Sequence, residues 1–175
     1  MRALIIISIS IIAVSGLHAQ SLKKYQVGNS GCSAYFFCNP GAFALEKSPD
    51  SSYVYTAECV GADSLNYGII CLKFSASATT SDLQTAEDVL ISYLDYLKTS
   101  LNIVSAAGYG KGHRLKNRED TRGVIDYWKD KDGYKWKIKG WTNGKNLAVL
   151  YVYSKGDLPE TRVNIFLDGL VLPGM

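Results

Sequence analysis

The run from Leu147 to Val152 is apolar at every position, and it constrains the fold of this chain more than any other segment. A strand with one face in water alternates apolar and polar side chains, whereas a strand covered on both faces has no such alternation. The run therefore predicts a central strand of a sheet, with protein packed on both sides and a helix on at least one of them.

Two further strand-like runs precede it, 123–129 and 134–141, and turn residues separate all three. Asn143-Gly144 is a typical hairpin signal, so 123–154 is expected to form a three-stranded antiparallel meander. In the middle strand Trp136 and Ile138 alternate with three lysines, which predicts one buried face and one solvent-exposed face carrying Lys135, Lys137 and Lys139.

Apolar residues recur every three or four positions over 83–101, which predicts an amphipathic helix of about five turns. Ser81 and Gln84 are placed to form its capping box. A second, shorter helix is expected near the end of the chain, capped by Asp157 and Glu160 and stopped by Gly169, and a last short strand at 171–172 follows it.

The first half contains three more strand-like runs, 34–37, 53–60 and 67–74, and the last two are arranged as a hairpin. Glycines at 108, 110 and 112 are typical of a loop. The expected fold class is therefore α+β: an antiparallel sheet with one long amphipathic helix and a short C-terminal helix packed on it.

Residues 1–19 have the layout of a secretory leader: Arg2, an apolar run that ends at Val14, and small residues up to Ala19. The apolar run is about half the length that a bilayer span requires. We therefore expect a cleaved signal peptide at 1–19, a single α+β domain at 20–175 with no integral membrane segment, and export to the periplasm or the extracellular medium.

All four cysteines lie in the first half of the mature chain. In an oxidising compartment an even number of cysteines favours disulfides, and three pairings are possible. A three-residue loop in the 53–74 hairpin would place Cys59 opposite Cys71, which favours the pairs Cys59–Cys71 and Cys32–Cys38. The alternatives are a four-cysteine zinc site, although the usual Cys-x-x-Cys spacing is lacking, and buried reduced thiols.

Catalytic motifs are sparse. His113 is the one histidine outside the leader, so it would have to serve as the base of any serine or cysteine triad, and no Gly-x-Ser-x-Gly sequence occurs. The glycine-rich segment around it makes Lys111, His113 and Arg114 a possible anion-binding group, but it matches no nucleotide-binding fingerprint. We therefore expect no catalytic residues, no cofactor and no metal.

Basic charge is concentrated in 111–145, which carries a local charge of +6 against +2 for the whole mature chain. Lysines interleaved with Trp136 resemble a nucleic-acid platform, but strand alternation sends the indole to the face opposite the lysines. We expect no nucleic-acid partner; the lysines are expected to form a solvated sheet face, with binding to an anionic envelope polymer as the alternative.

Carboxylate pairs for glycoside hydrolysis are the remaining catalytic hypothesis, with Glu119, Asp120 and Asp126 as possible members. Most strand tyrosines are expected to pack in the core or across strands, and a tyrosine-lined ligand groove is the alternative.

The stretch Trp136 to Lys145, the strand 147–153 and the close Phe166 to Leu170 resemble the PsbP-like fold over about the last hundred residues. The resemblance implies an antiparallel sheet with helices on its faces and a role in binding or assembly instead of catalysis. The paired cysteines of the first half are not part of that pattern.

Together these observations predict an exported binding or assembly protein whose partner is an unknown protein or envelope polymer. Two alternatives remain open: a secreted envelope hydrolase that uses carboxylates, and an inhibitor of secreted enzymes.

Overall fold

The computed structural model describes residues 21–175, so the predicted leader at 1–19 lies outside the described residues. The strand that carries the apolar run, β10 (Asn146–Ser154), lies between β5 (Asn66–Lys73) and β9 (Lys135–Thr142) near the middle of an eight-stranded antiparallel sheet. The other strands of this large sheet are β3 (Ala44–Lys47), β4 (Tyr53–Val60), β6 (Ile103–Ala106), β7 (Gly110–His113) and β8 (Arg122–Asp130).

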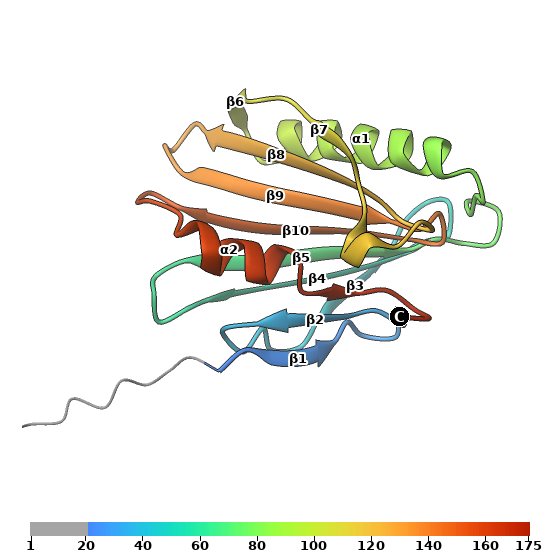
Figure 1. Ribbon diagram of the computed structural model, residues 1–175, viewed down its shortest axis with the longest axis horizontal. Helices are drawn as coiled ribbons and strands as arrows, with labels where there is room; N and C mark the ends of the chain where they lie inside the picture. The colour runs from blue at the N-terminus through green and yellow to red at the C-terminus, as the bar shows by residue number, and fades with distance from the viewer. Residues whose placement is uncertain (1–20) are drawn as a thin grey trace, which may run out of the picture.

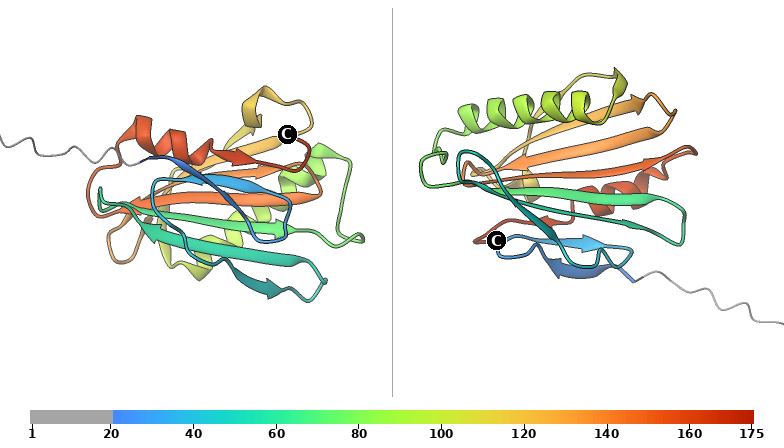
Figure 2. Two further views of the ribbon diagram at one scale, coloured as in Figure 1. Left: turned by 90° about the horizontal axis from the view of Figure 1, so that it is seen from below. Right: turned by 180° about the vertical axis from the view of Figure 1, so that it is seen from behind.

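Both faces of the large sheet are covered, as the apolar run predicts (Figure 1). The long helix α1 (Leu83–Ser100) packs on one face, against β8 and β9. The opposite face carries α2 (Glu160–Leu167) and a small sheet of three strands, in the order β1-β2-β11, formed by Lys23–Gln26, Ser33–Phe36 and Leu170–Val171 (Figure 2). Two hydrophobic clusters fill the two interfaces, so the expected α+β class with helices on an antiparallel sheet is confirmed.

Helix α1 forms where the hydrophobic pattern of its sequence predicts an amphipathic helix. Its apolar stripe is buried against the sheet, with Leu90 and Leu94 fully inaccessible to solvent. The predicted cap is wrong by one residue: Asp82, not Ser81, is the N-cap and accepts hydrogen bonds from the amides of Gln84 and Thr85. A carboxylate at this position also suits the positive end of the helix dipole.

The short helix α2 begins at Glu160 as expected, but its predicted capping box is wrong. Pro159 is the N-cap and no side chain hydrogen-bonds the first turn. Asp157 instead forms an ion pair with Lys135 at 3.0 Å. Gly169 ends the helix as predicted, since its amide donates to the Phe166 carbonyl after the C-cap Asp168.

The lysines of β9 do not form the fully wetted face that alternation predicts. Each lysine forms an ion pair with a carboxylate on or beside α2, and the pairs are Lys135–Asp157, Lys137–Glu160 and Lys139–Asp168. Only Lys135 is exposed, while Lys137 and Lys139 retain 5% and 8% of their accessible surface. Acidic residues distant in the sequence therefore cover part of the basic segment.

Four strands were not predicted, namely β1, β3, β6 and β7, and all are four residues long. The glycine-marked loop is wrong in part because Gly110–His113 forms β7 and pairs with β8. Within residues 21–175 no helix combines the length and apolarity that a membrane crossing needs.

Candidate functional site

A groove with a volume of about 490 Å³ opens on the α2 side of the large sheet, beside the edge strand β6. It is lined by 105–107 at the end of β6, 127–129 of β8, 135–137 of β9, and Leu158 and Glu160 at the start of α2. We call it the basic groove, since its lining carries three lysines and one carboxylate.

Two lysines of the basic groove are direct cross-strand partners. Lys129 on β8 pairs with Lys135 on β9, and both are exposed. Like charges directly opposite one another on one face of a sheet are destabilising. Asp157 lies 3.0 Å from Lys135, but none of the described residues places a carboxylate within 4.0 Å of Lys129. The groove therefore has positive charge that an external anion could neutralise.

The next cross-strand pair supplies an aromatic surface. Tyr127 pairs with Lys137, whose ammonium lies 5.1 Å from the centre of the Tyr127 ring. Tyr127 is 48% exposed, which is high for a tyrosine on an inner strand. Glu160, which is mostly exposed, pairs with the buried Lys137 at 3.3 Å, so the charge of Lys137 is already neutralised within the protein. The exposed ring of Tyr127 thus lines the same groove as the exposed Lys129 and Lys135.

The turn between β8 and β9 holds these lysines in place. Asp130, which is buried, accepts hydrogen bonds from the amides of Asp132 and Tyr134 and from the indole of Trp136, all at 2.9 Å. Burial alone would raise the pKa of the Asp130 carboxyl, but these hydrogen bonds outweigh it and hold that pKa below its ordinary value.

This arrangement predicts an acid-dependent loss of stability. A carboxyl whose pKa is lowered by folding stabilises the protein above its unfolded pKa, and that contribution is lost as the pH falls through the folded pKa. We expect Asp130→Asn to reduce the fall in unfolding midpoint between pH 5 and pH 3, measured by urea titration. Asp132→Asn, in the exposed part of the same turn, is the control. An unfolding midpoint that falls by the same amount in wild type and in Asp130→Asn would contradict the prediction.

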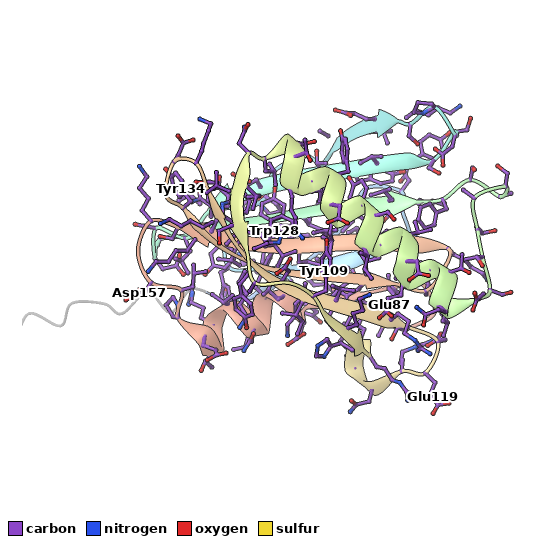
Figure 3. The ribbon with its side chains drawn as sticks, turned by 90° about the horizontal axis from the view of Figure 1, so that it is seen from above. Glu87, Tyr109, Glu119, Trp128, Tyr134 and Asp157 are labelled. Carbon is purple, nitrogen blue, oxygen red and sulfur yellow. A yellow bond between two sulfur atoms is a disulfide. The ribbon has the colours of Figure 1, made fainter. Side chains whose placement is uncertain are left out.

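The other face of β8 holds a buried ion pair with α1. Figure 3 looks onto α1 and labels Trp128 and Tyr109, which each contact one member of this pair. Asp126 is fully buried, accepts a 2.6 Å hydrogen bond from the Trp128 indole, and lies 3.3 Å from the ammonium of Lys98 on α1. Lys98 also donates to the Tyr109 hydroxyl at 2.8 Å. Burial opposes the charge on Lys98, but Tyr109 and Asp126 keep the pKa of Lys98 above its ordinary value.

The carboxylates considered for hydrolysis do not share a site with exposed reactive oxygens. Asp126 has no accessible surface and is occupied by Trp128 and Lys98. Asp120 pairs with Arg118, and Glu119 lies 3.5 Å from Arg114. No specific contact therefore favours the hydrolase hypothesis over binding.

The predicted anion-binding residues lie together in one short segment. Lys111 and His113 are exposed on β7, and Arg114 follows directly. The amide of Gly112 donates to the buried carboxylate of Glu87 at 2.9 Å, so a side chain of α1 occupies that donor. Anion binding by Lys111, His113 and Arg114 stays a prediction.

The predicted disulfide pairing is wrong, because Cys38 bridges to Cys59 and the pairs Cys59–Cys71 and Cys32–Cys38 do not form. The 53–74 hairpin has a five-residue loop, so Cys59 lies opposite Tyr67 and Cys71 lies opposite Tyr55. Tyr55 and Cys59 are four positions apart along the strand, about 13 Å, which exceeds the reach of a disulfide. The bridge also removes two of the four thiolates that the zinc hypothesis needs.

The five-residue loop has a clear cause. Asp63 accepts hydrogen bonds from the Leu65 amide at 3.2 Å and the Tyr67 hydroxyl at 2.6 Å, and Gly61 donates to the Leu65 carbonyl. Arg162 of α2 also contacts Asp63. A contact with a distant helix therefore helps to set the register, which the hairpin sequence alone does not reveal.

A second hollow, of about 810 Å³, lies near the start of α1, lined by hydroxyl and amide side chains with one lysine and one aspartate, Lys145 and Asp120. It has neither a like-charge pair nor an exposed aromatic ring. The basic groove is therefore the stronger candidate for ligand binding. Sequence reasoning found Lys135 and Lys137 but missed Tyr127 and Lys129, which the alternation of 123–129 places on the same face.

Comparison with known proteins identifies the fold. No protein-family model matches the chain, and no curated protein matches it. Among solved structures, the solution structure of cyanobacterial PsbP (CyanoP) from Synechocystis is similar, with a TM-score of 0.50 and 13% sequence identity over 93% of this chain and 98% of that one. The chain thus has a PsbP-like fold, and the likeness extends well beyond the last hundred residues.

Proposed function

We propose that the protein is an exported, non-catalytic binding protein whose basic groove binds an acidic polysaccharide segment of the cell envelope. The observation that carries this proposal is the cross-strand pair Lys129 and Lys135, two like charges placed opposite one another beside the exposed ring of Tyr127. The PsbP-like fold supports a binding or assembly role, although fold alone does not assign a function.

The groove suits an acidic sugar chain for two physical reasons. A carboxylate between Lys129 and Lys135 would relieve their repulsion and form charge-assisted hydrogen bonds with both ammonium groups. An adjacent sugar ring could pack its apolar face on Tyr127, since aromatic side chains present a large apolar surface at low cost in conformational entropy. The leader and the Cys38–Cys59 bridge both agree with a location outside the cytoplasm.

Calorimetric titration of the purified mature chain with oligogalacturonate, an acidic probe, tests this proposal. We expect binding that weakens as salt rises, with no binding of a neutral maltooligosaccharide of equal length. The double substitution Lys129→Gln and Lys135→Gln is expected to weaken binding by about 100-fold or more, because hydrogen bonds to charged groups contribute about 1.5–3 kcal/mol each and two of them are lost.

The matched control replaces Lys23 and Lys24, two exposed lysines on β1, with glutamine and should leave the affinity unchanged. Circular dichroism of each variant verifies the fold. Equal loss in both double variants would show nonspecific charge attraction and overturn the groove as the site. Stronger binding of polyglutamate than of oligogalacturonate would indicate a protein partner and overturn the choice of a polysaccharide.

A further inference from the structure

Strand β2 has a cysteine near each end, and both cysteines face the large sheet. Cys38 follows β2 and bridges to Cys59 on β4. Cys32 directly precedes β2, at the other end, and its free thiol lies beside the free thiol of Cys71 on β5. The two sulfur atoms of this second pair are therefore neighbours across the same interface as the first pair.

Several contacts hold Cys32 and Cys71 in place. Cys32 and Cys71 have no accessible surface and belong to the cluster between the two sheets. The Ser30 hydroxyl accepts a 3.0 Å hydrogen bond from the Cys32 amide and also contacts both thiols. Lys73, two residues after Cys71, donates to the Asn29 carbonyl at 3.4 Å. These contacts hold the loop before β2 against β5.

We infer that Cys32 and Cys71 form a second disulfide in the exported protein, so that β2 is linked covalently to the large sheet at both ends. The reaction joins the two sulfur atoms and releases two protons and two electrons. The electrons pass by thiol–disulfide exchange to an oxidant, a disulfide-bonded oxidoreductase or a small-molecule disulfide, which is reduced to two thiols. Exchange occurs before the small sheet packs, because the folded protein buries both sulfur atoms.

Burial gives the two bridges different reactivity. Cys38 and Cys59 are partly exposed, whereas Cys32 and Cys71 are not. A reductant added to the folded protein should therefore reduce Cys38–Cys59 first and leave Cys32–Cys71 intact until the chain unfolds.

Alkylation followed by intact-mass measurement tests the inference on the mature chain secreted through an oxidising compartment. Protein denatured without reductant should incorporate no alkyl groups. Mild reduction of the folded protein should allow two, and reduction after unfolding should allow four. Two alkyl groups in the unreduced, denatured protein, located on Cys32 and Cys71, would overturn the inference.

Peptide mapping must use a protease that separates Cys32 from Cys38 and Cys59 from Cys71. Trypsin leaves Cys32 with Cys38 in 25–47, and Cys59 with Cys71 in 48–73, so every inter-peptide connectivity gives the same tryptic product. Chymotrypsin cuts at 35–37 and after Tyr67, which separates them. A linked Cys32–Cys71 peptide is the expected product, and a linked Cys32–Cys38 or Cys32–Cys59 peptide would contradict it. The double variant Cys38→Ser and Cys59→Ser should still show no free thiol, whether or not it reaches full stability.

Discussion

Replacing Trp141 with alanine is expected to lower the free energy of unfolding by about 3–5 kcal/mol, the usual range for removing a buried aromatic side chain. Trp141 is 3% exposed and lies in the cluster between the large sheet, α2 and the small sheet. Its indole donates to the Leu167 carbonyl at the end of α2 at 3.0 Å. The ring also lies directly over Gly123, where an added Cβ atom would approach it to 2.2 Å. The substitution therefore creates a cavity and leaves a carbonyl without its partner.

Urea unfolding monitored by far-UV circular dichroism measures this loss. Trp141→Phe retains most of the packing but not the N–H group, so it should cost less, about 1–3 kcal/mol. Tyr96→Ala, at an aromatic residue that is 62% exposed, is the control and should change stability little. A loss below about 1 kcal/mol for Trp141→Ala would show that the two layers do not depend on this contact.

The elements that can be predicted best from the sequence are those with a long and unbroken hydrophobic pattern. The stripe of α1 and the apolar run of β10 each fix an element and a buried face with no knowledge of the rest of the chain. The short strands β6 and β7 give no such signal, because four exposed or half-exposed residues carry no readable period. They become strands through pairing with β8.

The candidate site was harder to predict because its parts meet only in three dimensions. The basic groove combines the end of β6, two inner strands and the start of α2, which lie up to about fifty residues apart in the sequence. The cysteine pairing depends in the same way on where the small sheet packs, and α2 supplies the acids that cover Lys137 and Lys139. Local periodicity assigns faces, but it does not say which distant segment covers them.

The buried pair Lys98–Asp126 carries the second large effect. Asp126→Ala is expected to lower the free energy of unfolding by about 3–5 kcal/mol, because it leaves the Lys98 ammonium, the Trp128 indole and the Tyr127 amide without a common acceptor in a region that excludes water. Only 20% of the Lys98 side chain is exposed. The remaining contacts of Lys98, with Asp95 and Tyr109, lie nearer the surface and compensate in part.

A double-mutant cycle separates the cost of an orphaned charge from the value of the pair. Lys98→Met in combination with Asp126→Leu replaces both charges with apolar side chains, and a pair replaced in this way often costs little. We therefore expect the double variant to be more stable than Asp126→Leu alone, with an interaction free energy of at least about 1 kcal/mol. Asp157→Asn, which removes the exposed partner of Lys135, is the control and should not shift the unfolding midpoint. If the two single effects simply add, Lys98 and Asp126 are not coupled, and the prediction is wrong.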